Sequence, residues 1–404
     1  MNSGKKEYKD LLFKIKSSPL KTGLKEEIKN SSCTSKQKRK LLFKYFWYRI
    51  VRRKYTERAI RKNLSECFKE DSYYKESCIS HPLVSVIVPN YNHAAFLRQR
   101  IESILNQSFQ DFELILLDDC STDDSKEILL SYCENPKVSH VVINEENTGN
   151  TFLQWEKGVQ LSKGQFIWIA ESDDYAAPEL LSSLVPHLLR VSEASFAYVG
   201  SYWVDVKGFV LPEGLDLWPD TGEVHYYRGK TFARHNLLYF NGVYNASMVV
   251  FRKSMFQKIE KKFAGMRYAG DWLCWFEMAM QGMVIEVQRK QNYFRQHNNK
   301  VTSRSMKNYG GVFDSIYIGK VVTEKLCMSF YMREMLRGYI YNHIRGIARC
   351  EVDERMLLDK LEVVLGGVKR SYILFRVNKF LQKKLHIPFL SMPLHDKLNS
   401  KRFC

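Results

Sequence analysis

The sequence lacks the features that mark several common classes of protein. Its nine cysteines are irregularly spaced and form no Cys-x-x-Cys pair, so the sequence indicates neither a zinc site nor a disulfide framework. No apolar run approaches the roughly 18 residues of a membrane-spanning helix. The lysine-rich N-terminus has no apolar core of a secretion signal, and the chain has no internal repeat. We therefore expect a protein of the reducing cytoplasm that is neither secreted nor integral to a membrane.

Two phosphate-binding loops are also missing. The chain has no Gly-x-Gly-x-x-Gly motif after its first predicted strand and no Gly-x-x-x-x-Gly-Lys-Ser/Thr loop. A dinucleotide-binding Rossmann site and a Walker-type phosphate cradle are therefore excluded. Any phosphate that binds here needs a cation, held by side chains, to neutralise its charge.

The composition indicates a packed core, and the charge is segregated along the chain. Of the 404 residues, 45% are hydrophobic, and 24 are Phe and 23 Tyr. The net charge of +18 divides into +13 for residues 1–80, −5 for residues 81–300 and +10 for residues 301–404. A nucleic acid, an anionic membrane surface or a phosphate-bearing acceptor would each suit such basic ends.

Strands and helices alternate in the central part of the chain. Apolar runs predict strands over 83–88, 112–117, 138–143 and 165–170, and helical stretches lie between them near 95–106, 124–133 and 151–162. This alternation predicts a parallel sheet covered on both faces, an α/β fold. Further on we expect a helix over 179–190, strands over 195–206, 245–251 and 282–295, a loop-rich section over 207–244, a helix over 271–281, and mostly helix from about 317. We predict three regions: a basic helical extension (1–80), a central domain (81–305) and a basic helical region (306–404).

The fourth predicted strand ends in a dense acidic turn. The apolar run 166–170 is followed within four residues by Glu171, Asp173 and Asp174. Like charges this close together repel one another and favour a counter-cation, and carboxylate oxygens suit Mg²⁺ or Mn²⁺, which in turn hold phosphate oxygens. A solvated acidic turn is the alternative for this segment taken alone.

The other predicted strand ends carry polar groups as well. The first ends in Pro-Asn-Tyr-Asn (89–92), the second in Leu-Asp-Asp-Cys-Ser-Thr-Asp-Asp (117–124), and the third leads into Asn-Thr-Gly-Asn (147–150). Ligands of open α/β sheets bind at the carboxyl ends of the strands. Four such ends in a row predict a nucleotide-binding cleft.

Together these motifs resemble the family 2 glycosyltransferases. The segments 84–92, 117–124 and 171–174 follow the order and spacing of that family, and the resemblance covers about residues 83–302. It implies the GT-A fold, a Rossmann-like fold of nucleotide-diphospho-sugar transferases, here with helical N- and C-terminal extensions. It also implies an inverting, metal-dependent, hexosyltransferase-like enzyme that uses a nucleoside-diphosphate sugar, with UDP as the expected nucleotide, and Mg²⁺ or Mn²⁺ as cofactor.

The resemblance assigns roles to individual residues. The family's nucleotide pocket and its D-x-D motif fall on Pro89, Asn90, Tyr91, Asp118, Asp119, Asn147, Gly149, Glu171 and Asp173. The metal ligands implied are Asp173, Asp174 and His297. The diphosphate would lie near Arg295 and Lys157, and the catalytic base would be Asp271. Glu171 departs from the family's usual Asp, and a helix N-cap is the structural alternative for Asp271.

The acceptor and the site of action follow from the family and from the basic ends. We expect a glycan or lipid-linked glycan acceptor in bacterial polysaccharide, capsule or surface-glycan assembly, and a peripheral contact with an anionic membrane at the inner face of the plasma membrane. The aromatic and cationic segment 41–54 fits a helix in a membrane interface or a surface helix packed on the main domain equally well. Two other functions compete: a catalytically inactive nucleotide-sugar-binding protein, and an RNA-binding protein. No nucleic-acid partner is expected, because the central domain is acidic and carries no RNA-module signature.

Overall fold

The computed structural model describes residues 10–11, 24–35, 37–42, 82–212, 218–297, 309–348 and 350–385. The chain divides into two compact units. The larger unit comprises residues 71–328 and 343–366, and the smaller one residues 1–70, 329–342 and 367–404. The predicted division at residues 80 and 305 stays a prediction. Apart from Leu41 and Leu42, the predicted interfacial segment 41–54 lies outside the described residues.

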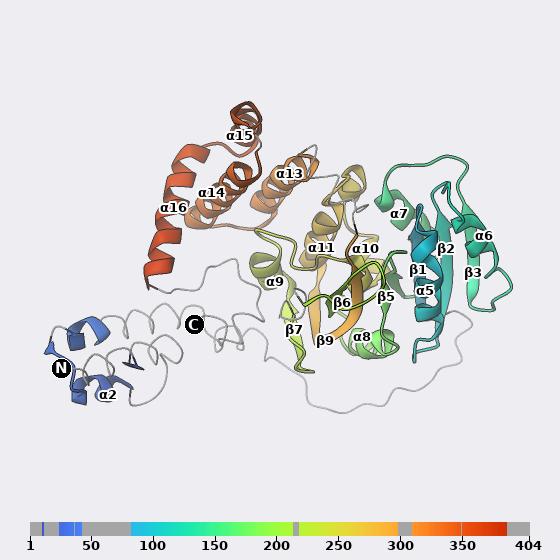
Figure 1. The fold of residues 1–404 in the computed structure, drawn as a ribbon, viewed down its shortest axis with the longest axis horizontal. Helices are drawn as coiled ribbons and strands as arrows, with labels where there is room; N and C mark the ends of the chain where they lie inside the picture. Colours follow the sequence, from blue (N-terminus) through green and yellow to red (C-terminus); the bar gives the residue numbers. More distant parts are fainter. Residues whose placement is uncertain are drawn as a thin grey trace. The chain divides into compact units, whose positions relative to one another are not determined.

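The larger unit is built on a sheet of nine strands, counted over the described residues, in the order β3-β2-β1-β4-β8-β6-β9-β5, with β7 paired to β9 (Figure 1). Its first half is parallel and confirms the predicted α/β pattern: β1 (Val84–Asn90), β2 (Phe112–Asp118), β3 (Val138–Ile143) and β4 (Phe166–Ile169). Every residue of β1, β2 and β4 is buried, as continuous apolar runs predict for strands covered on both faces.

Helices α5 (Ala94–Leu105), α6 (Ser125–Leu130) and α7 (Thr151–Leu161) connect the parallel strands. Helix α7 packs closely on β1 because Gly158 faces Ile87: a Cβ at that position would lie 2.4 Å from the Ile87 side chain. Gln154 and Trp155, in the first half of α7, donate to Asp119 and Glu171, so this part of the helix lies at the carboxyl ends of the strands, where the predicted site lies.

The second half of the sheet is mixed. Strand β8 (Val249–Arg252) is antiparallel to β4 and β6 (Ala194–Val204), and β6 runs parallel to the long strand β9 (Met283–Arg295). Helix α8 (Leu180–Arg190) precedes β6, and helix α11 (Gly270–Gln281) precedes β9. The short strand β5 (Tyr175–Ala176) pairs antiparallel with β9, so it brings the segment after β4 beside the end of β9.

Section 207–244 is more ordered than its sequence predicts. It contains β7 (Val224–Arg228), antiparallel to β9, and α9 (Gly229–Asn236). Strand β7 is a short edge strand whose Tyr227 is buried and whose other residues are partly or fully exposed. So short a segment, without a long apolar run, gives little signal in the sequence, because the pairing with β9 supplies its stability.

The C-terminal part is helical, as predicted, and begins at α13 (Gly310–Lys325). Helix α15 (Glu351–Leu365) packs on α13 within the larger unit, and the Tyr309 hydroxyl donates to Asp353 at 2.7 Å. In the smaller unit, the first part of α14 (Phe330–Ile347) packs on α16 (Val368–Leu385), where Gly338 faces Phe375. Helix α2 (Leu24–Asn30) contributes to a separate small core of that unit. No helix in the described ranges has the length and apolarity that crossing a membrane requires.

Candidate functional site

The ends of β1 and β2 are joined by a buried network around Asp118. Asn90 pairs with Asp118 in the strand register, and its Nδ2 donates to Asp118 Oδ1 at 2.7 Å. Ser121 donates to the same carboxylate twice, from its backbone N–H at 2.8 Å and its hydroxyl at 2.6 Å. Pro89 is buried within β1, whereas Tyr91, next along the chain, is 40% exposed at the sheet edge. Asp118 therefore fixes the turn from which Tyr91 projects.

Asp119 holds the next part of this edge together. Its carboxylate accepts hydrogen bonds from Asn144 at 2.8 Å, from Gln154 at 2.9 Å, and from both the backbone N–H and the hydroxyl of Thr148 at 3.0 and 2.8 Å. Asn147 donates to the Asp119 carbonyl at 2.9 Å. The structure thus brings together the predicted nucleotide residues of β2 and of the turn after β3, and it engages both aspartates within the protein.

Lys157 lies on the same side of the site. Its ammonium group donates to Asn144 Oδ1 at 2.6 Å, so it is tied to the Asp119 network at the end of β3. Gly149 has a φ of +66°, a left-handed conformation that glycine adopts without strain, and it allows the chain to turn into α7. Asn150 then caps that helix by accepting from the Phe152 N–H.

The acidic turn after β4 is anchored by Asp174. This carboxylate is fully buried and accepts from Asn245 and Ser247, both at 2.8 Å, and from the Arg295 N–H at 3.0 Å. Burial, together with the nearby charge of Asp173, raises the pKa of Asp174 to about 6. Because its oxygens face these donors, Asp174 is not among the groups that the structure brings together as possible metal ligands.

Glu171 points toward α7. Its Oε1 accepts a hydrogen bond from the indole N–H of Trp155 at 2.9 Å, and its backbone N–H donates to Ser247 Oγ. Burial and the neighbouring Asp173 raise the pKa of Glu171 to about 8. The side chain is therefore engaged on the α7 side of the turn, and it is not among the possible metal ligands.

Arg295 ties the end of β9 to the acidic turn. It is 1% exposed, and its guanidinium donates to the carbonyls of Asp173, Asp205 and Val206 and to the Gln99 side chain at distances of 2.5 to 3.0 Å. It also stacks over Phe96, 4.6 Å from the ring centre. The structure therefore fastens Arg295 to the turn, and the contact with the diphosphate that the resemblance implies stays a prediction.

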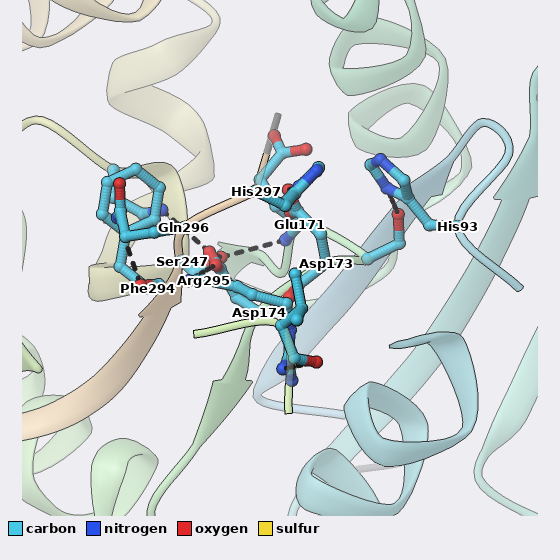
Figure 2. Close-up of polar contacts among 12 residues, drawn as sticks. His93, Glu171, Asp173, Asp174, Ser247, Phe294, Arg295, Gln296 and His297 are labelled. Atoms are coloured by element: carbon cyan, nitrogen blue, oxygen red, sulfur yellow. Dashed lines mark hydrogen bonds and ion pairs between the residues drawn. The ribbon is translucent and has the colours of Figure 1, made fainter. Parts of the chain in front are cut away.

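His297 meets Asp173, as their sequence positions predict. Nε2 of His297 lies 2.9 Å from Asp173 Oδ2, although 124 positions separate the two residues in the chain. His93 lies beside them: one nitrogen of each imidazole and one Asp173 oxygen lie within 4.8 Å of one another (Figure 2). The local sequence around His93 does not indicate this contact, because the fold alone brings His93 beside the turn after β4.

This group has the donor atoms and the spacing that a divalent cation requires. Metal–ligand bonds of about 2.1 Å at right angles place neighbouring ligand atoms about 3 Å apart, which matches the 2.9 Å between His297 and Asp173. Imidazole nitrogen and carboxylate oxygen both bind first-row divalent ions. The residues present therefore fit a bound cation.

A buried arginine lies beneath the acidic turn. Arg100, on α5, is fully buried and stacks 4.9 Å over the Trp168 ring of β4, and its three guanidinium nitrogens have no hydrogen-bond partner among the described residues. Burial lowers its pKa to about 10, and the charges of Asp174, Glu171 and Asp173 oppose that shift. Arg100 is therefore cationic at neutral pH and offsets part of the turn's negative charge.

Asp271 stands in the first turn of α11, where backbone N–H groups and one side chain donate to it. Asn241 donates to its Oδ2 at 2.8 Å, and burial raises its pKa to about 7. The loop before the helix is held by Asp314 of α13, which accepts from the N–H groups of Tyr268 and Ala269, both at 3.0 Å. A carboxylate with a pKa near the pH of the cell is suited to accept a proton. No local sequence pattern marks Asn241 as part of the site.

Comparisons with known proteins agree with the family resemblance of the sequence. Residues 85–260 match the model of a family described as glycosyl transferase family 2. Two bacterial relatives are provisionally named for surface polysaccharides. A teichuronic acid biosynthesis glycosyltransferase, TuaG, of Bacillus subtilis is 34% identical over 119 residues, which cover 30% of this chain and 46% of TuaG. A colanic acid biosynthesis glycosyl transferase, WcaA, of Escherichia coli is 24% identical over 160 residues, 39% of this chain and 55% of WcaA.

The chain thus spans about half the length of the curated relatives it matches. Among solved structures, residues 1–349 of TarS from S. aureus in complex with UDP-GlcNAc match with a TM-score of 0.56 and 17% identity, over 79% of this chain and 89% of that one. This likeness confirms the predicted GT-A fold.

Proposed function

Because residues 85–260 of this chain match the model of the family described as glycosyl transferase family 2, we propose that the protein transfers a sugar from a nucleoside-diphosphate donor to an acceptor hydroxyl and inverts the anomeric configuration. The family match carries the proposal, since it covers the strand ends that hold Asp118, Asp119 and Asp173, and His297, which lies beyond the matched residues, pairs with Asp173. UDP is the proposed nucleotide, and the TarS structure with UDP-GlcNAc supports that choice. The names of TuaG and WcaA support bacterial surface-polysaccharide synthesis as the process.

Asp271 is the proposed base. Attack on the anomeric carbon from the side opposite the leaving nucleotide requires a group that removes the proton of the acceptor hydroxyl. With a pKa of about 7, a large fraction of Asp271 is ionised at neutral pH, and the same pKa makes it a far stronger base than an ordinary carboxylate. Asn241 fixes the orientation of the carboxylate through its hydrogen bond to Oδ2.

Asp173 and His297 are the proposed ligands of Mg²⁺ or Mn²⁺. A cation bound there would stabilise the negative charge that develops on the departing diphosphate. The protein holds Asp173 in place through its backbone: the Asp173 carbonyl accepts from Arg295, and the next residue, Asp174, is bonded to Asn245 and Ser247. Arg295 and Asp174 therefore act through Asp173 in this proposal.

The turns after β2 and β3 are the proposed nucleotide pocket. Among the described residues, Oδ2 of Asp119 accepts one hydrogen bond, from the Thr148 hydroxyl, whereas Oδ1 accepts three. A carboxylate oxygen has two lone pairs, so Oδ2 can also accept the N3–H of a uracil. Tyr91, exposed at the neighbouring strand end, can cover the base.

Contact with an anionic membrane is the proposed way of reaching a glycan or lipid-linked glycan acceptor, at the inner face of the plasma membrane. Helix α16 buries Val368, Ser371 and Phe375 and exposes a second face with three large apolar side chains. These are Ile373, Val377 and Phe380, which are 63%, 51% and 60% exposed. Lysines and arginines on the same helix add positive charge, as in amphipathic helices that lie on anionic membranes.

Liposome flotation tests the membrane contact. The intact chain should float with anionic vesicles at low salt and less at high salt, and replacing Ile373, Val377 and Phe380 together with Ser should weaken flotation. A chain that does not float at low salt would exclude the contact and leave sugar transfer untouched.

The proposed reaction is tested by donor binding and transfer. Thermal unfolding would be measured with UDP-, GDP-, CMP- and dTDP-sugars, each with Mn²⁺ and with a chelator. A donor at about 100 times its Kd stabilises the fold by about 2.7 kcal/mol, so the UDP-sugar should raise the Tm by several degrees, and the chelator should abolish the shift. Release of UDP and incorporation of labelled sugar into a glycan acceptor would follow. Absence of any metal-dependent donor binding would overturn the proposal.

One observation favours a second function, nucleotide-sugar binding without transfer. Glu171 takes the first acidic position of the turn and is bonded to Trp155 rather than placed with Asp173 and His297. If this arrangement disables the site, donor binding will depend on the metal, but neither hydrolysis nor transfer will occur with any acceptor. Detection of product excludes this alternative.

A further inference from the structure

His93 joins the acidic turn from a different strand end. It follows β1 and immediately precedes α5, and its Nδ1 lies 2.8 Å from the hydroxyl of Ser172, the residue between Glu171 and Asp173. Its ring is 5.7 Å from that of His297, measured between centres. Figure 2 shows the three side chains His93, Asp173 and His297 around the turn.

We infer that His93 is a direct ligand of the divalent cation, so that the protein supplies two imidazoles and one carboxylate: His93, Asp173 and His297. The inference rests on the proposed function, because the cation would bind where the donor's diphosphate is proposed to lie. It goes beyond the resemblance, which assigns a metal role to Asp173, Asp174 and His297 and none to His93.

The surroundings of His93 suit a metal ligand. Ser172 is 1% exposed, so its hydroxyl is a fixed partner for Nδ1. In the tautomer that donates from Nδ1 to Ser172, the lone pair on Nε2 is the coordinating group, and such a partner on the second nitrogen is the usual arrangement of metal-bound histidines. Phe96 lies beside both imidazoles, 6.1 Å from His93 and 5.5 Å from His297 between ring centres, and restricts their movement.

A second imidazole changes which metal the site prefers. Carboxylate and water oxygens suit Mg²⁺, whereas imidazole nitrogen favours first-row transition ions. With His93 bound, the site should therefore favour Mn²⁺ and Co²⁺ over Mg²⁺. Without His93, the affinity for Mg²⁺ should change least.

Two substitutions test whether His93 binds the metal directly or only forms a hydrogen bond with Ser172. In His93→Asn, the amide occupies the place of Nδ1 and can keep the hydrogen bond to Ser172, but Nε2 is lost. In His93→Ala, both are lost. His140→Asn is the matched control, because His140 bonds only to the adjacent Ser139 in the described structure and lies on β3. His297→Asn is the positive control.

The measurement is metal binding to the full chain without nucleotide. Mn²⁺ binding would be followed by electron paramagnetic resonance, Mg²⁺ by competition against Mn²⁺, and Co²⁺ by its visible absorption, which reports nitrogen ligation. We expect both His93 variants to bind Mn²⁺ and Co²⁺ more weakly by at least the roughly 10- to 100-fold that losing an outer-shell partner costs, with the Mg²⁺ affinity changed less, and the Co²⁺ spectrum to change. Circular dichroism and Tm would show that each variant is folded.

The inference is overturned if His93→Asn binds Mn²⁺ and Co²⁺ as the wild type does, since His93 would then only hold Ser172, or if the folded chain binds none of the three metals. The proposed function can fail separately. A chain whose Co²⁺ affinity depends on His93 but which transfers no sugar supports the metal site and refutes the reaction. If His93→Asn changes neither sugar transfer nor metal affinity, the reaction is supported and His93 is not a metal ligand.

Discussion

The aspartates at the two sides of the site have opposite surroundings. Asp119, after β2, accepts four hydrogen bonds, from Asn144, Gln154 and twice from Thr148. Asp271, in the first turn of α11, receives one side-chain hydrogen bond, from Asn241, and burial raises its pKa to about 7. Asp119 is almost fully buried and has a donor for each of its oxygens, whereas Asp271 is partly exposed, and the donors that it has do not outweigh the effect of burial on its pKa.

This difference indicates a structural role for Asp119 and a reactive role for Asp271. Hydrogen bonds to the ionised form hold a carboxylate charged and fixed, whereas burial without enough donors destabilises the charge and makes the group a stronger base. The two turns therefore suggest opposite outcomes of substitution. Removing Asp119 should damage the fold, and removing Asp271 should damage the proposed reaction while sparing the fold.

The largest effect is expected from Asp271→Asn. Asn is nearly the same size and can keep a hydrogen bond to Asn241, but it cannot accept the acceptor's proton. We expect the transfer rate to fall by about 10²- to 10⁴-fold with little change in the KM for the donor. Steady-state kinetics with the UDP-sugar identified by the binding panel would measure it.

Asp359→Asn is the matched control for that experiment. Asp359 is an exposed acid on α15 and should give wild-type kinetics. A folded Asp271→Asn protein with wild-type turnover would show that Asp271 is not the base. The proposed difference in role between Asp271 and Asp119 would then be wrong.

The next effect is on stability, from Asp119→Ala. The substitution leaves the donors of Asn144, Thr148 and Gln154 without their acceptor in a part-buried turn. Since hydrogen bonds to a charged group and unsatisfied buried donors each contribute about 1–3 kcal/mol, we expect the free energy of unfolding to fall by at least about 3 kcal/mol. Urea unfolding would measure it.

Asp124→Ala, at an exposed acid of the same segment, should change stability much less. If Asp119→Ala is as stable as this control, the hydrogen bonds do not stabilise the turn. The structural role that we assign to Asp119 would then be wrong.

The sequence was enough to predict the sheet and part of the site. The four parallel strands lie within two residues of their predicted ends, because continuous apolar runs and polar strand ends are local patterns. The pairing of Asp173 with His297 followed from a family motif rather than from local chemistry. The resemblance likewise gave Asp271 its role, and the raised pKa is consistent with it.

What the sequence could not predict depends on long-range packing. Arg100 looks like a solvent-facing helix residue until α5 is placed over Trp168. The resemblance could not show that the Arg295 guanidinium donates to carbonyls from segments that lie about 90 and 120 positions away. His93 and Asn241 contact the site through pairings between different strand ends and loops, which no local pattern encodes.

The dependence of stability on pH gives a smaller effect. The pKa of Asp271 lies above its ordinary value of 3.8 when the protein is folded, so the folded state holds this proton more tightly than the unfolded state. The stability that results is present below the unfolded pKa and is lost as the pH rises through about 7. Asp271→Asn should therefore gain stability relative to the wild type between pH 5 and pH 8. Urea unfolding at the two pH values checks this, and an unchanged difference would show that Asp271 is not desolvated.

The smallest effect should come from Asn241→Ala. Transfer by the wild type should rise with pH up to about 7, where Asp271 becomes ionised, and then level off. The hydrogen bond from Asn241 stabilises the ionised form and lowers the pKa of Asp271, against the larger effect of burial. Its loss should move the rising limb of the pH–rate profile to higher pH by less than about one unit. Asn106→Ala, at an exposed asparagine after α5, should leave the limb in place. A limb that moves to lower pH would contradict this expectation. It would mean that water enters the space left by Asn241 and solvates the carboxylate better than the amide does.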